Sequence, residues 1–149
     1  MIGEEVRLSR RILTAAAQLV INLVLWIIIP SILLSFIRQD VPNIPLAYPD
    51  FIYAFGAAIT GLQVLRALTE GKAVSVVFAS GGNVTSAFYI WEAVNGGTLS
   101  VTAAGMSVTF VFEALLFLLM LPSLFGAVKA PLVFLLDQSE AARAAPELP

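Results

Sequence analysis

TFVFEALLFLLMLPSLFG, spanning Thr109–Gly126, places one carboxylate, that of Glu113, inside an otherwise apolar run. A run of this length and character is typical of a helix that crosses a bilayer, because about 20 apolar residues are needed to span about 30 Å of hydrocarbon. An ionisable side chain in such a helix is costly and usually has polar neighbours. The run therefore predicts a membrane fold and, at Glu113, a candidate polar site.

The composition of the whole chain agrees with a membrane protein. Of its 149 residues, 59% are hydrophobic and 12% are charged, whereas soluble domains carry about 25% charged residues. The chain has no cysteine and no histidine, which excludes disulfides, thiolate chemistry, structural zinc and Ser/His nucleophile pairs. We expect no metal and no cofactor. A net charge of −2 without a basic patch argues against a nucleic-acid partner.

Four apolar runs predict four membrane-spanning helices, since lipid cannot satisfy the backbone of an open sheet. The expected spans are residues 12–37, 51–68, 73–94 and 99–121. The fold class that follows is all-α: an integral membrane four-helix antiparallel bundle within one domain, residues 1–137. Pro30 predicts a kink in the first span.

The segment after the fourth run differs from the spans in its proline and glycine content. Residues 122–136 are apolar but contain two prolines and a glycine, so we expect an interfacial segment along the cytoplasmic leaflet rather than a fifth span. Residues 138–149 should form a mobile cytoplasmic tail.

The connections indicate how the helices follow one another. TEGK (Thr69–Lys72) and NGGT (Asn95–Thr98) predict tight turns, which would make the last three helices antiparallel neighbours. RQDVPNIPLAYP (Arg38–Pro49) contains three prolines and predicts a stiff external crossing.

Basic residues give the orientation. With the N-terminus inside, the cytoplasmic side holds seven of them and the other side holds only Arg38. The seven are Arg7, Arg10, Arg11, Arg66, Lys72, Lys129 and Arg143. This bias predicts that both termini are cytoplasmic, in a multi-pass protein of the cell (plasma) membrane.

Each predicted helix carries polar residues at one depth of the membrane. With Leu121 at the cytoplasmic end of the fourth span, Glu113 would lie about 12 Å in, near the midplane. The candidate midplane polar site comprises Glu113, Asn83, Asn22, Gln18, Gln63, Thr60 and Thr109. We expect Glu113 to accept or donate a hydrogen bond with an amide such as Asn83. An ion or proton site and simple interhelical hydrogen bonding both fit these residues.

Small residues predict close helix packing. Ala57 and Gly61 are four residues apart, and Gly81 and Gly82 are adjacent in the third span. Glycine pairs can also mark an unwound ion-binding element, but small residues more often let two helices approach closely.

Two functions remain in view. The first is a non-catalytic packing or assembly subunit of a homo-oligomeric or larger membrane complex, because no nucleophile and base can be assembled. The alternative is a small oligomeric ion channel or proton-coupled transporter that uses a midplane carboxylate. In either case the expected partners are the lipid bilayer and copies of the chain itself or other membrane subunits.

Overall fold

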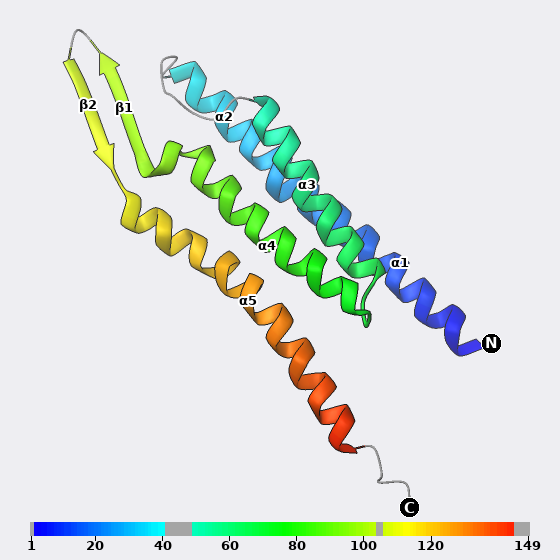
Figure 1. Cartoon of the computed structure of the whole chain (residues 1–149). Helices are drawn as coiled ribbons and strands as arrows, with labels where there is room; N and C mark the ends of the chain where they lie inside the picture. Colours follow the sequence, from blue (N-terminus) through cyan, green and yellow to red (C-terminus); the bar gives the residue numbers. More distant parts are fainter. Residues whose placement is uncertain (1, 41–48, 104–105, 145–149) are drawn as a thin grey trace, which may run out of the picture.

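The computed structural model describes residues 2–40, 49–103 and 106–144, and long helices dominate it (Figure 1). The elements in chain order are α1 (Ile2–Leu23), the π-helical turn η1 (Val24–Ile28), α2 (Ile29–Asp40), α3 (Pro49–Leu68), α4 (Ala73–Ala93), the 3₁₀ turn η2 (Asn95–Gly97), β1 (Thr98–Ala103), β2 (Met106–Val111) and α5 (Glu113–Ala144). The first three elements form one rod.

Four helical segments are long and apolar enough to cross a membrane, as expected of a multi-pass membrane protein. They are Leu8–Gln39, Asp50–Leu68, Ala73–Ala93 and Glu113–Glu140. The first three agree closely with the spans expected from hydropathy.

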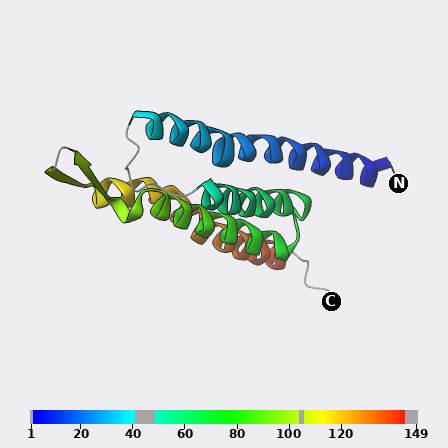
Figure 2. The same ribbon diagram turned by 90° about the horizontal axis from the view of Figure 1, so that it is seen from above.

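The helices contact one another in chain order. α1 packs on α3, α3 on α4, and α4 on α5, so α3 and α4 are the inner helices (Figures 1 and 2). Their apolar windows are each 28% buried, against 11% for the first span and 6% for α5. Ile59 of α3 and Leu116 of α5 are the largest fully buried side chains. The outer faces of α1 and α5 are left for lipid or for another chain.

The two ends of the molecule differ. The start of α1, the α3–α4 turn and the end of α5 lie toward one end, where α1 and α5 both project past the turn (Figure 1). The strands β1 and β2 project at the opposite end (Figures 1 and 2).

The predicted fourth span at 99–121 is wrong in its first half, and the chain is therefore not all-α. Residues 98–103 and 106–111 form an antiparallel hairpin in which Leu99 pairs with Phe110 and Ser100 with Thr109. The physical reason is the alternation of hydroxyl and apolar residues, a period of two that suits a strand and not a helix. Span four begins at Glu113 instead.

Residues 122–136 were predicted to form a separate interfacial segment, but they continue α5 without a break to Ala144. The helix accommodates Pro122 and Pro131 in its interior. The predicted mobile tail is helical over residues 138–144, and its last five residues lie outside the described part, as does most of the proline-rich crossing after Arg38.

α4 satisfies backbone carbonyls that two prolines leave free on its neighbours. Pro30 has no N–H, so the helical bond to the Trp26 carbonyl, four residues earlier, is lost. The Tyr89 hydroxyl donates to that oxygen at 3.3 Å. Instead of only a kink, the structure has the π-helical turn η1 directly before Pro30, in which the Ile29 N–H bonds to the Val24 oxygen.

Pro131 in α5 shows the same arrangement. Its missing N–H frees the Ala127 carbonyl, and the Ser80 hydroxyl of α4 donates to that oxygen at 2.9 Å. In hydrocarbon no water can take this role, and a side-chain donor on a neighbouring helix is one way to satisfy the freed carbonyl.

Candidate functional site at the basic end of the helices

Charged side chains are segregated between the two ends of the helices. Among residues whose side chains are described, the end with the α3–α4 turn holds Arg10, Arg11, Arg66, Glu70, Lys72, Lys129, Asp137, Glu140 and Arg143. The hairpin end holds Arg38, Asp50, Glu92 and Glu113. The first group has six cations and three carboxylates, and the second has one cation and three carboxylates. We call the first the basic end.

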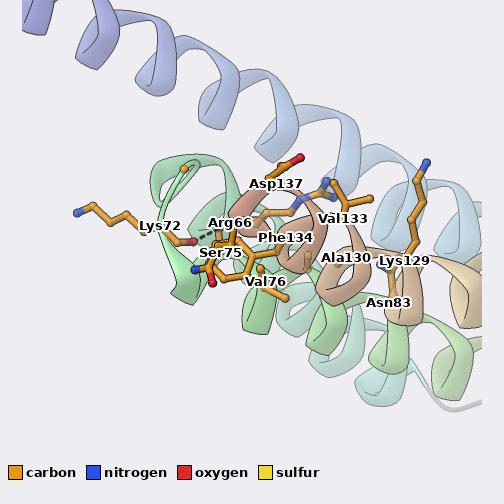
Figure 3. Close-up of a pocket in the computed structure, with 14 residues that line it drawn as sticks. Arg66, Lys72, Ser75, Val76, Asn83, Lys129, Ala130, Val133, Phe134 and Asp137 are labelled. Atoms are coloured by element: carbon orange, nitrogen blue, oxygen red, sulfur yellow. Dashed lines mark hydrogen bonds between the residues drawn. The ribbon is translucent and has the colours of Figure 1, made fainter. Parts of the chain in front are cut away.

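A cavity of about 660 Å³ opens at the basic end between the α3–α4 turn, the first half of α4 and the second half of α5 (Figure 3). Its charged lining residues are Arg66, Lys72, Lys129 and Asp137. Asn83 and Ser75 add neutral polar groups, and the remaining wall is mostly apolar. The cavity therefore combines a net positive lining with an apolar surface.

The charged side chains occupy different parts of this cavity. Arg66 and Asp137 lie near one another in Figure 3, while the Lys72 and Lys129 ammonium groups extend outward at its two ends. Arg66 Nη1 donates to Oε1 of Gln63 at 3.4 Å, a long hydrogen bond. No described residue forms an ion pair with Arg66, Lys72 or Lys129.

A second cavity of about 340 Å³ lies on the other side of Arg66, between α1, α3 and the start of α4. Its lining is largely polar: Thr14, Gln18, Gln63, Arg66, Ala67, Glu70 and Ser75. The structure thus brings together Gln18 and Gln63, two members of the predicted polar site.

Asn22 and Thr60 lie deeper among the helices and are 7% and 3% exposed. The Asn22 amide donates to the Gln18 carbonyl oxygen at 2.7 Å and to its side-chain oxygen at 3.1 Å. These two residues therefore share one face of α1, as predicted from their spacing. The Thr60 hydroxyl is buried and has no hydrogen-bond partner in the described chain.

Asn83 lines the first cavity, and it contacts α5 at Gly126 and not at Glu113. A Cβ built on Gly126 would lie 2.8 Å from Asn83 Nδ2, so the amide lies directly over this glycine. Glu113 is thirteen residues earlier in α5, or about 20 Å along the helix.

The structure places Glu113 at the start of α5, and not in the middle of a spanning helix as the sequence predicted. Glu113 is exposed in the first turn of α5, and its backbone packs against Gly97 at the hairpin end. Gly97 has φ +85° and a built Cβ would lie 2.9 Å from Glu113 Cα, so only glycine fits there. An acidic residue in the first turn of a helix is stabilised by the helix dipole, and this explains a carboxylate at position 113 without a binding site.

Thr109 also lies away from the predicted slab. It is in β2, and its hydroxyl is 2.9 Å from the hydroxyl of Ser100 across the hairpin. Its distance from the other polar residues follows from the misassigned start of the fourth span.

The small residues divide into two groups. Gly82 is buried against Gln63 and Leu62 of α3, and Gly81 lies next to Leu62. Ala57 and Gly61 are exposed, and nothing lies within 4 Å of a Cβ built on Gly61. Packing by this second pair stays a prediction and requires a neighbour outside the chain.

The sequence analysis did not identify two glycines, Gly56 and Gly126, at which helices approach each other closely. Gly56 lets α3 approach η1, since its built Cβ would lie 2.8 Å from the Trp26 oxygen, and Gly126 lets α5 approach Asn83. The proline four residues after Trp26 was a usable signal, because it marks a carbonyl that a neighbouring helix must approach.

The described residues contain no group of three or more Asp, Glu, His or Cys side chains that could hold a metal ion. In comparisons of the chain with family models, curated proteins and solved structures, no match was found. The function is therefore inferred from the geometry of the two ends and of the cavities between the helices.

Proposed function

We propose that the chain is a non-catalytic subunit of a membrane assembly, with its four helices antiparallel in the plasma membrane and both termini in the cytoplasm. The segregation of cations supports this orientation, because basic residues are retained on the cytoplasmic side. The basic end would then be cytoplasmic, and the hairpin would lie on the outer side.

The observation that carries the proposal is the unpartnered hairpin. Alternate strand residues point to opposite faces, so Leu99, Val108 and Phe110 share one face and Ser100 and Thr109 share the other. Val108 and Phe110 are 52% and 56% exposed. An isolated two-stranded hairpin is marginal in water, and its open edges invite pairing with another strand.

The hydrocarbon core of the membrane is not a favourable environment for this hairpin. Unpaired backbone groups at a sheet edge are not satisfied in hydrocarbon, so the strands should lie outside the membrane core. α3 has 20 residues, or about 30 Å of helix, which fills that core by itself. Contact with a second copy or with another subunit would bury the apolar face and pair the edges.

The test is native mass spectrometry of the full chain extracted from its own membranes in a mild detergent. We expect a defined homo-oligomer or a stoichiometric complex with other subunits. The double substitution Val108→Ser, Phe110→Ser on the apolar face should dissociate it. Ser107→Asn, on the hydroxyl face, is the matched control and should leave it intact. A monomer in native extracts, or equal behaviour of both variants, would reject the proposal.

A second candidate, passage of a small ion or polar solute, is favoured by the 340 Å³ polar cavity at the basic end. Gln18 and Gln63 line it, and the buried Asn22 and Thr60 continue the polar residues inward along α1 and α3. In this version the amides, and not Glu113, would line the path.

Flux into liposomes containing the purified chain separates the two candidates. A conducting function predicts that Gln63→Leu abolishes flux while Glu113→Gln leaves it unchanged. Absence of flux above that of protein-free liposomes would leave assembly as the function.

A further inference from the structure

The 660 Å³ cavity at the basic end has features that neither assembly nor conduction uses. Its cationic residues come from three parts of the chain: Arg66 from α3, Lys72 from the turn and Lys129 from α5. Asp137 is the one carboxylate among its lining residues, so the lining carries a net charge of +2. We propose that this cavity binds the phosphate of an anionic phospholipid, with an acyl chain lying along α5.

Arg66 is placed to be the principal phosphate ligand. Its side chain lines the cavity (Figure 3), and its one hydrogen bond in the described chain is the 3.4 Å bond to Gln63. A guanidinium offers a planar set of donors that matches two phosphate oxygens at once. Lys72 and Lys129, at the two ends of the cavity, have flexible side chains that can close on a bound anion from either side.

The start of α4 adds a favourable dipole. Lys72 precedes the helix in an extended conformation, and its side chain does not cap the first amides. Lys72 and Ser75 both line the cavity, so the positive end of the α4 dipole faces the same space. The Ser75 hydroxyl donates to the Lys72 carbonyl at 2.7 Å, so it does not itself donate to an anion in the cavity.

An apolar hollow next to the cavity distinguishes a lipid from a soluble phosphate. The hollow, of about 390 Å³, shares Gly126 and Lys129 with the cavity. Its other lining residues are Pro122, Phe125, Val128 and Leu132. An acyl chain in this hollow would extend from Lys129 toward the middle of the membrane, which a free phosphate has no use for.

The depth of the cavity also fits a lipid headgroup. Lys129 and Asp137 lie sixteen and twenty-four residues after Glu113, or about 24 and 36 Å along α5. With Glu113 at the outer boundary, these positions bracket the inner boundary of a hydrocarbon core about 30 Å thick. Basic pockets between helices at this level are suited to anionic headgroups.

The experiment measures lipid retention by the full chain in detergent, using native mass spectrometry with dioleoylphosphatidylglycerol and dioleoylphosphatidylcholine as probes. We expect the phosphatidylglycerol adduct to be preferred. Arg66→Gln and Lys129→Gln should each weaken this preference about fivefold. Arg143→Gln, which removes a cation at the same end but outside the cavity, is the matched control and should not change it.

Asp137→Asn tests the site even if the cation variants fold poorly. Removing the one carboxylate should strengthen phosphatidylglycerol retention, a gain that misfolding does not produce. Equal retention of the two lipids, or a loss in Arg143→Gln as large as in Arg66→Gln, would overturn the site. Displacement of bound lipid by inorganic phosphate alone would overturn the acyl-chain contact and assign the cavity to a soluble anion.

Discussion

The Tyr89 hydroxyl of α4 donates a hydrogen bond to the main-chain oxygen of Trp26, 3.3 Å away and sixty-three residues earlier in the chain. The same two side chains meet edge to face, with ring centroids 5.4 Å apart and planes at 87°. Phe51 of α3 also stacks on Tyr89, with ring centroids 5.6 Å apart. One side chain thus holds η1, α3 and α4 together at the position where Pro30 interrupts the helical bonding.

Tyr89→Phe should remove the hydrogen bond and leave the ring contacts in place. Hydrogen bonds between membrane helices contribute about 0.6 kcal/mol on average, so we expect a loss of about 1 kcal/mol or less in the free energy of unfolding. Tyr89→Ala also removes the contacts with Trp26 and Phe51 and should cost about 3–5 kcal/mol. Unfolding by SDS in mixed micelles measures both, and equal losses would show that the ring is not packed as described.

Ser80 and Pro131 should be energetically coupled. Ser80→Ala leaves the Ala127 carbonyl without its donor, whereas Pro131→Ala supplies a backbone N–H that can restore the helical bond. Ser80→Ala should therefore destabilise the wild-type chain by more than it destabilises a Pro131→Ala background, with a coupling of about 0.5 kcal/mol or more. The double-mutant cycle uses the same SDS unfolding, and additive effects would contradict the pairing.

The sequence was informative wherever one physical factor dominated. The length and hydropathy of the apolar runs were sufficient to predict the first three spans, because the bilayer thickness sets the length of a membrane-spanning helix. The spacing of Gln18 and Asn22 correctly placed them on one face of α1, since helical periodicity is local.

Two of the errors, the start of the fourth span and the position of Glu113, came from the assumption that residues 99–121 form one helix. A hydropathy average over a long window does not detect that hydroxyl residues such as Ser100 and Thr109 alternate with apolar ones. Two strands with this alternation were therefore taken for the first half of a membrane-spanning helix. Moving the start of the span to Glu113 moved its carboxylate from the expected midplane to the helix end. The pairing of Asn83 with Gly126 could not be predicted, because it depends on how α4 and α5 align in three dimensions.

Gly56 and Gly61, both in α3, should respond in opposite ways to alanine. A Cβ at Gly56 would lie 2.5 Å from Ile27 Cγ1 and 2.8 Å from the Trp26 oxygen, so Gly56→Ala forces α3 away from η1. Overpacking of this kind costs about 1–3 kcal/mol. Gly61→Ala meets open space and improves helix propensity by about 1 kcal/mol. If another subunit covers Gly61, the gain should appear in the isolated chain and disappear in the assembly.

Glu113→Gln and Asn83→Leu test the corrected placement of these two residues. Glu113 is exposed in the first turn of α5, where a carboxylate interacts favourably with the helix dipole, so its loss should cost about 0.3–1 kcal/mol. Asn83 lies over Gly126, with its amide atoms 2.8–2.9 Å from a Cβ built there. Leucine has the same branching as asparagine, but its two terminal methyl groups are larger than the amide oxygen and nitrogen and should crowd Gly126. Asn83→Leu should cost about 1–3 kcal/mol, and the double variant should be additive because the sites are about 20 Å apart. Strong coupling between the two substitutions in SDS unfolding would instead place the carboxylate and the amide in contact.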